Sequence, residues 1–111
     1  MSATDEVREK IIDAARAQRT INYGDIAPLL GLDMGDPADR VRIGHILGEI
    51  SKEEHAAGRP MLSVVVTLKG EGRPGHGFFE LALELGLTKG ADEETFFIRE
   101  LTRVFQYWSQ T

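Results

Sequence analysis

The sequence predicts a mostly helical α+β domain of winged-helix type, with a small β-sheet and a C-terminal amphipathic helix. Two short helical patterns joined by a tight link precede a long amphipathic helix. A β-branched run and a glycine-rich turn follow that helix. This order of elements is typical of a winged helix. The chain of 111 residues shows no linker or internal repeat, so we expect one domain over residues 1–111.

The first predicted helix begins at Thr4, the expected N-cap, and runs to about Gln18. Asp5 and Glu6 follow the cap, where the positive end of the helix dipole favours acids. Apolar residues recur at helical spacing at Val7, Ile11, Ala14 and Ala15. We expect Thr20–Ile21 to be a short extended link to the next helix.

The second predicted helix opens on a capping-box pattern, Asn22 followed by Asp25, and Gly31 ends it. Pro28 lies inside this segment, where a proline loses a hydrogen bond and clashes with the preceding turn. The regular helix is therefore expected to begin near Asp25.

The third predicted helix has the clearest start in the chain, because Asp36 supplies an N-cap, Pro37 the first helical position and Asp39 an acid at the third. Its apolar stripe consists of Ile43, Ile46, Leu47 and Ile50. Gly58 and Pro60 end this long amphipathic helix.

A single strand is predicted over Met61–Lys69, because Val64–Val66 is a β-branched run that is apolar enough to be buried on both faces. Residues 70–77 are half glycine and predict a loop. For Phe78–Leu85 the apolar residues cover every face, and we favour a short buried helix over a strand.

The last predicted element is a C-terminal helix that Asp92 caps. One apolar stripe should close the core, and it consists of Phe97, Leu101, Val104, Phe105 and Trp108.

Composition limits the classes of function. The chain has no cysteine, which excludes disulfides, thiolate metal sites and cysteine nucleophiles. It shows no signal-peptide pattern and no stretch of membrane-spanning length, so we expect a cytoplasmic protein without a membrane partner. The net charge of −5 is unusual for a nucleic-acid binder, and of four consecutive segments only 60–77 is net positive.

In a winged helix, the start of the third helix enters the major groove, where Arg40 and Arg42 could meet phosphates or guanine edges. The glycine-rich loop could act as a wing that presents cations to an anion, or it could be a simple connecting turn. It is equally open whether the two arginines only solvate a helix end beside Asp36 and Asp39. The candidate nucleic-acid-binding residues are Tyr23, Arg40, Arg42, His45, Lys69, Arg73 and His76.

The segment from Thr20 to Phe79 resembles the DNA-binding domain of alkylguanine DNA alkyltransferases and alkyltransferase-like proteins. The residues that carry the resemblance are Tyr23-Gly24-Asp25-Ile26-Ala27, Gly44, Pro60 and Gly75-His76-Gly77-Phe78. The family's Pro-Cys-His-Arg is replaced by Pro60-Met61-Leu62-Ser63, so alkyl transfer is excluded. The arginine that the family inserts into the duplex is replaced by Val41. The resemblance therefore implies DNA binding alone.

A second resemblance covers residues 58–63 and 72–78, Gly-Arg-Pro-Met-Leu-Ser and Gly-Arg-Pro-Gly-His-Gly-Phe. It is to small uncharacterised bacterial and prophage domains, some of them beside nuclease modules. This pattern implies no particular activity.

No catalytic residue, metal site or cofactor is predicted. Gly70, Gly72 and Gly75 match G-x-G-x-x-G, but a dinucleotide site needs a second parallel strand after the following helix, and no segment beyond Gly86 is suited to form one. His45 and His55 are ten residues apart, a spacing that places them on different parts of a helix surface. No arrangement of a nucleophile, a base and an orienting group is visible.

Three hypotheses remain from the sequence. The first is a non-catalytic domain that binds double-stranded DNA, in regulation, DNA repair or phage-related functions. The second is a protein-interaction or regulatory module that uses its acidic surface, or an apolar patch on the last helix, to bind a protein partner or form a homodimer. The third is a small enzyme or nuclease.

Overall fold

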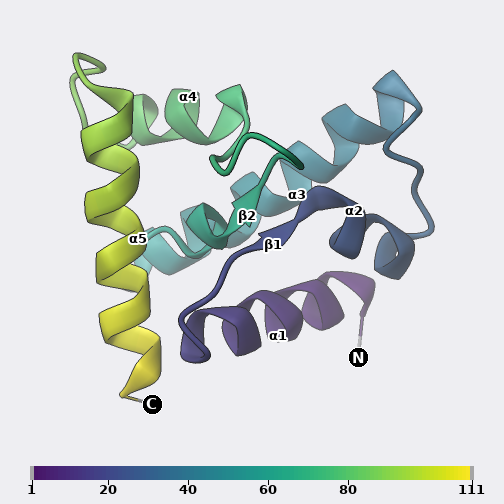
Figure 1. The fold of residues 1–111 in the computed structure, drawn as a ribbon, viewed down its shortest axis with the longest axis horizontal. Helices are drawn as coiled ribbons and strands as arrows, with labels where there is room; N and C mark the ends of the chain where they lie inside the picture. Colours follow the sequence, from purple (N-terminus) through teal and green to yellow (C-terminus); the bar gives the residue numbers. More distant parts are fainter. Residues whose placement is uncertain (1, 111) are drawn as a thin grey trace.

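A computed structural model describes residues 2–110 of the chain (Figure 1). Its elements in order are α1 (Ala3–Arg16), β1 (Ile21–Asn22), α2 (Tyr23–Ile26), the 3-10 turn η1 (Ala27–Leu30), α3 (Pro37–Ala56), the 3-10 turn η2 (Leu62–Val65), β2 (Val66–Thr67), α4 (His76–Glu84) and α5 (Glu93–Ser109). The prediction of a mostly helical α+β chain with a small sheet and a C-terminal helix is confirmed. Over the described range, no helix is long and apolar enough to cross a membrane.

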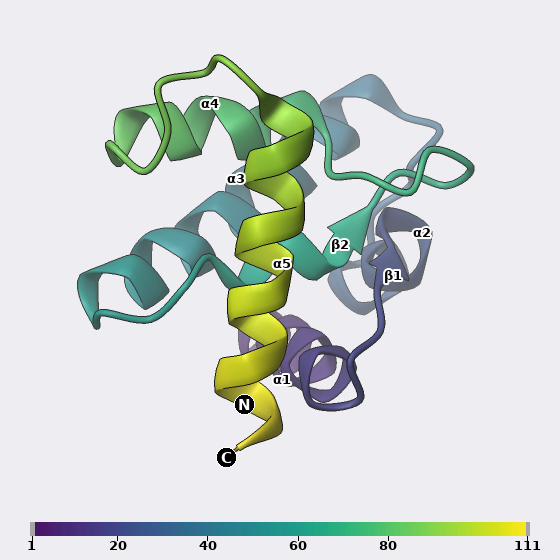
Figure 2. The same ribbon diagram turned by 60° about the vertical axis from the view of Figure 1, so that its left-hand side comes forward.

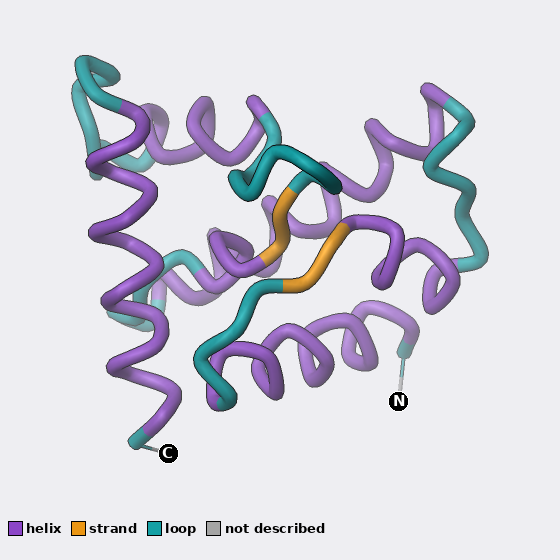
Figure 3. Tube along the Cα trace, in the orientation of Figure 1, coloured by secondary structure: helices purple, strands orange, loops and turns teal. Residues whose placement is uncertain are grey.

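The two short strands lie side by side in the middle of the molecule, with helices around them (Figure 3). They pair in parallel, with Ile21 opposite Val66 and Asn22 opposite Thr67. Helices α1 and α5 contact each other, and both pack against η2. When the molecule is turned, α5 runs along the front, with α3 behind it (Figure 2). The core lies between α1, α3, α4, α5 and the η2–β2 segment.

Helix α1 begins two residues before the predicted start, so the expectation that Thr4 is its N-cap is wrong. The Asp5 amide donates to the Ser2 hydroxyl oxygen and the Ser2 amide donates to the Asp5 carboxylate, both at 3.1 Å. This reciprocal capping box satisfies two backbone donors, whereas Thr4 is followed three residues later by Val7, which cannot return a bond. The helix ends at Arg16, because Gln18 adopts a left-handed backbone with φ of 55°.

The second helix begins at Tyr23 rather than near Asp25, while its cap and its stop are confirmed. The Asn22 amide donates to the Asp25 carboxylate at 3.0 Å. Pro28 takes the second position of η1, where its missing N–H leaves no bond unmade. Gly31 ends the turn with φ of 67°, a conformation that favours glycine.

Helix α3 starts as predicted, since the Asp36 carboxylate accepts from the Ala38 amide at 2.9 Å. Its buried stripe includes Ile43, Leu47 and Ile50. It runs for 20 residues, a length of about 30 Å at 1.5 Å per residue.

The prediction of a strand over Met61–Lys69 is wrong for most of its length. Residues 62–65 form η2, and only Val66–Thr67 is a strand. The cause lies in two buried side chains: the Met61 amide donates to Glu100 at 3.0 Å, and the Ser63 amide donates to the Ser51 hydroxyl at 3.0 Å. These acceptors satisfy backbone donors that a neighbouring strand would otherwise have to satisfy.

The glycine-rich loop leads from β2 into helix α4, not into the second strand of a hairpin. The short helix predicted over Phe78–Leu85 is confirmed, although it begins at His76, two residues earlier. Asp92 caps α5 as predicted, accepting from the Thr95 amide at 3.0 Å. The Thr95 hydroxyl also donates to the Asp92 carboxylate. This hydroxyl bond is the largest cause that lowers the pKa of the Asp92 carboxyl, and the amide bond adds to it.

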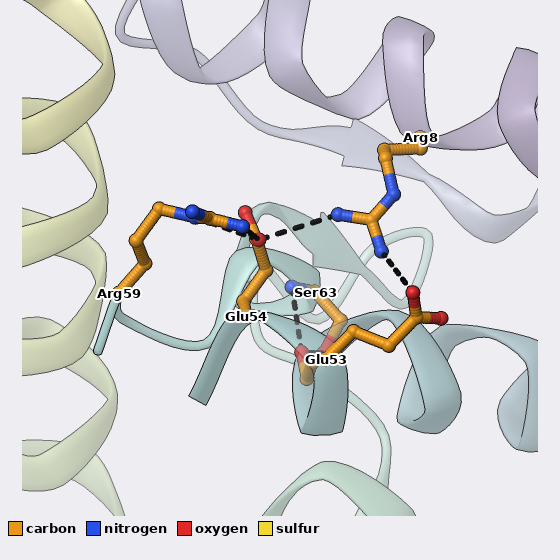
Figure 4. A network of polar contacts seen from close by, with 6 residues as sticks. Arg8, Glu53, Glu54, Arg59 and Ser63 are labelled. Atoms are coloured by element: carbon orange, nitrogen blue, oxygen red, sulfur yellow. Dashed lines mark hydrogen bonds and ion pairs between the residues drawn. The ribbon is translucent and has the colours of Figure 1, made fainter. Parts of the chain in front are cut away.

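A buried carboxylate connects α1, α3 and the segment that precedes η2 (Figure 4). Glu54, on the last turns of α3, has no exposed surface. Its Oε2 accepts from the Arg59 Nε at 2.8 Å and lies 3.3 Å from the Arg8 Nη1. Arg8 also reaches Glu53 at 3.3 Å. The second Glu54 oxygen, Oε1, is buried and has no hydrogen-bond partner among the described residues.

Arg59→Met should lower the free energy of unfolding by about 3 kcal/mol, at the low end of the cost of removing one partner from a buried pair, because Arg8 remains. Urea denaturation measures the loss. Lys52→Met is the matched control, since it removes a cation from the exposed Lys52–Glu49 pair and should cost less than about 1 kcal/mol. Equal losses in the two variants would show that Glu54 is not an essential junction.

Candidate nucleic-acid interface

The start of α3 projects two arginines into solvent. Arg40 and Arg42 are both exposed, and neither lies within ion-pair distance of an acid among residues 2–110. Between them is Val41, which is 74% exposed. This first stretch of α3 therefore offers two free cations and one apolar side chain.

The acids nearest to this helix start are used to hold the backbone. The Asp39 carboxylate accepts from the Asp33 amide at 2.9 Å, which ties the preceding loop to the first turn of the helix. Asp33 accepts from the Gly35 amide at 2.8 Å, and Asp36 caps the helix. None of these three carboxylates pairs with Arg40, so the possibility that nearby acids neutralise this arginine directly does not apply.

A hollow of about 190 Å³ lies beside Arg40, between α3, the start of α2 and the start of α4. Its lining is mostly apolar and glycine-rich, and consists of Tyr23, Met34, Arg40, Gly44, Leu47, Gly48, Ser63, Leu68, Gly75, Gly77, Phe78 and Leu81. A neighbouring hollow shares Tyr23, Met34 and Leu68 with it and extends to Lys69. Arg40 and Lys69 thus border two neighbouring hollows, and Tyr23 lines both of them.

Tyr23 fastens the glycine-rich loop to α2. Its hydroxyl oxygen accepts from the Gly75 amide at 3.1 Å. Burial raises the pKa of the Tyr23 phenol, and the Gly75 hydrogen bond opposes this only in part. A Cβ at Gly75 would lie 3.2 Å from the Tyr23 oxygen, so glycine permits this close approach.

The loop that carries Lys69 is closed by its own backbone. The Leu68 amide donates to the Arg73 carbonyl at 2.8 Å, and the Glu71 amide donates to the Leu68 carbonyl at 3.1 Å. Gly70 and Gly72 have φ values of 83° and 66°, which other residues adopt only with strain. The tight turn holds Lys69 in solvent at its tip.

The other predicted site residues are placed elsewhere. Arg73 turns towards α5, where it pairs with Glu93 at 3.0 Å and lies 5.0 Å from the centre of the Phe79 ring. His76 pairs with Glu80 at 2.8 Å on α4. The structure therefore places Arg40 and Lys69 at two neighbouring hollows that share Tyr23, and it engages Arg73 and His76 in other contacts.

Arg42 and His45 border a separate shallow hollow on the other side of the α3 start, together with Val41. His45 also lies 4.0 Å from Glu49, one helical turn further along. The two hollows lie on either side of the same helix end.

Sequence reasoning missed three buried polar residues of the core, Glu54, Glu100 and Ser51. A signal for Glu54 was present: Ile43, Leu47, Ile50 and Glu54 follow one another at intervals of four, three and four, so the carboxylate falls on the apolar stripe. Glu100 has the same relation to Phe96, Phe97 and Val104 in α5. An acid at a stripe position predicts a buried, paired carboxylate.

No group of three or more His, Cys, Asp or Glu side chains within residues 2–110 is arranged to hold a metal ion. The described residues after α4 contain α5 and no strand, so the G-x-G-x-x-G match lacks the second strand that a dinucleotide site needs.

Comparisons with protein-family models, curated proteins and solved structures find no match to this chain.

Tyr23→Phe should lower the free energy of unfolding by about 1–2 kcal/mol, because it leaves the partly buried Gly75 amide without its acceptor. Gly75→Ala should be costly in the natural chain and cheaper in the Tyr23→Phe background, since the close contact is with the Tyr23 hydroxyl oxygen. A double-mutant cycle measured by urea denaturation gives this coupling. Additive losses would contradict the Tyr23–Gly75 contact.

The raised pKa of Tyr23 predicts a loss of stability at high pH. Because the folded-state pKa exceeds that of the unfolded chain, about 10, the contribution is complete below that pH and disappears as the pH rises through the folded-state value. The free energy of unfolding should fall more steeply with alkaline pH for the natural chain than for Tyr23→Phe. Parallel curves would exclude a shifted phenol at this position.

Proposed function

We propose that the chain is a winged-helix-like domain that binds double-stranded DNA without catalysis. The start of α3 lies in the major groove and contacts the bases or the phosphates. The turn that carries Lys69 makes a second contact, to the phosphate backbone of the duplex. Arg40 and Arg42 are suited to phosphate oxygens or guanine edges, and Lys69 to a phosphate.

The observation that carries this proposal is that three cationic side chains are exposed and unpaired. Arg40, Arg42 and Lys69 are exposed and have no ion-pair partner among the described acids. By contrast, Arg8, Arg59 and Arg73 are each paired within the protein. Arginines held on a rigid helix start without a partner are suited to an external anion.

The carboxylates of Asp33, Asp36 and Asp39 lie around the helix start and accept backbone hydrogen bonds. Together with the net charge of −5, they weaken long-range attraction of DNA. Binding of DNA therefore depends on directed contacts by the three cations. We expect the affinity for DNA to be modest and to fall as the salt concentration rises.

The resemblance of Thr20–Phe79 to the alkyltransferase DNA-binding domain supports the same proposal for binding. It gives no support for chemistry, because Ser63 replaces the family's arginine, and its hydroxyl lies 2.6 Å from that of Ser51 in the core. A buried, hydrogen-bonded serine without an adjacent base is a structural residue.

A second candidate function, binding of a protein partner, is favoured by one observation. Helix α5 leaves Ile98 54% exposed and Tyr107 38% exposed. Such a partner would cover α5, far along the chain from the α3 start, so the two candidate surfaces can be tested separately.

Changing Arg40 and Arg42 together to alanine should weaken binding of a duplex and reduce the slope of log affinity against log salt by about 2, because each lost phosphate contact contributes about 0.9. Titration of labelled duplex by fluorescence anisotropy at several salt concentrations gives both quantities. The matched control is Lys89→Ala with Arg99→Ala, which removes two exposed cations near the α4–α5 connection.

The control should leave the salt slope unchanged. Equal effects of the two double variants would mean that binding is a diffuse charge effect. Absence of any duplex binding by the natural chain would contradict the proposed function itself.

A further inference from the structure

Val41 has no evident role in folding. It is 74% exposed, the largest exposure among the large apolar side chains of the described chain. A β-branched residue in an exposed helical position restricts its own rotamers and is a weaker helix former than the charged residues beside it. Neither helix propensity nor packing therefore explains valine here.

The surroundings of Val41 combine apolar and cationic groups. A shallow hollow of about 700 Å³ lies along this side of α3 and the start of α1, and it is lined by Thr4, Ala38, Asp39, Val41, Arg42, His45 and Ile46. Val41, Ala38 and Ile46 supply apolar surface to this lining, while Arg42 and His45 supply nitrogen-bearing polar groups. The Asp39 carboxylate in this lining is bonded to the Asp33 amide.

Charge and chemistry select the occupant. A position between two unpaired arginines favours a polyanion over an apolar protein surface. Among the edges that DNA bases present in the major groove, the C5-methyl group of a pyrimidine is the one apolar group, and it is contacted by aliphatic side chains. A valine between two exposed arginines that are suited to phosphates or guanine edges matches this group.

We propose that Val41 is a specificity-determining residue that contacts the C5-methyl group of a pyrimidine in the major groove. This inference rests on the proposed function and extends it from DNA binding in general to a preference for methylated pyrimidines. Two bases carry the group, thymine and 5-methylcytosine, and they differ in the hydrogen-bonding groups beside it.

The test uses three sets of short random-sequence duplexes that differ only in this methyl group. In the first set the bases are natural, in the second deoxyuridine replaces thymidine, and in the third 5-methylcytosine replaces cytosine. Each set carries the same phosphate charge and the same Watson–Crick pairing. Competition against a labelled natural duplex gives relative affinities at fixed salt.

The natural chain should bind the thymine set about fourfold more tightly than the deoxyuridine set, which is the effect of burying one methyl-sized group. Tighter binding of the 5-methylcytosine set by a similar factor identifies the methyl group itself as the feature recognised. Tighter binding of thymine alone means that the neighbouring thymine oxygen is also required. Either result supports the Val41 contact if the ratio depends on Val41.

Val41→Ser should bring the thymine-to-deoxyuridine ratio close to one while Arg40 and Arg42 still support binding, and Val41→Ile should keep the ratio. Ile98→Ser, at another exposed apolar position, is the control and should leave the ratio unchanged. Thermal melting verifies that each variant is folded. Binding with a ratio of one in the natural chain, or a ratio that Val41→Ser leaves unchanged, overturns this inference but not DNA binding. Absence of duplex binding overturns both.

Discussion

The buried Glu54 carboxylate is the constraint on which the arrangement of the helices depends. It is fully enclosed at the C-terminal end of α3 and joins Arg8 of α1 to Arg59 ahead of η2. Arg59 in turn interacts with Tyr107 of α5. A charge removed from water must keep its partners, so these elements hold one geometry. Because α3 is anchored near this end, Arg40 and Arg42, about 20 Å away along the helix, can remain unpaired without a structural role.

Buried polar side chains also explain why the sheet is small, because they accept hydrogen bonds that a neighbouring strand would otherwise accept. Glu100 and Ser51 accept from the amides of Met61 and Ser63, so the chain can turn as η2 before it pairs for two residues with β1. The glycine-rich turn follows directly after this short pairing. The Gly75 amide then donates a hydrogen bond to the Tyr23 hydroxyl oxygen and holds the end of the turn against α2. The two hollows beside Arg40 and Lys69 are thus bounded by segments that contacts in the core hold in place.

Local signals in the sequence predicted most of the helices, because caps and stops act over three or four residues. Asp36, Asp92 and Gly31 all perform the predicted roles. The prediction of a strand over Met61–Lys69 was wrong because a run of β-branched residues indicates burial but does not determine the backbone conformation. Tertiary hydrogen bonds to Ser51 and Glu100 determine the conformation there. Among the site residues, the exposure of Arg40 and Arg42 followed from the helix pattern. The engagement of Arg73 with Glu93 and Phe79 did not, since it depends on a helix 20 residues further along.

Amide hydrogen exchange of the chain with and without duplex DNA would locate the binding surface directly. If the α3 start and the Lys69 turn form that surface, added duplex should slow exchange in residues 38–46 and 68–76 and leave α5 unchanged. Protection centred on α5 around Ile98 and Tyr107, or no protection anywhere, would contradict a DNA interface at the start of α3.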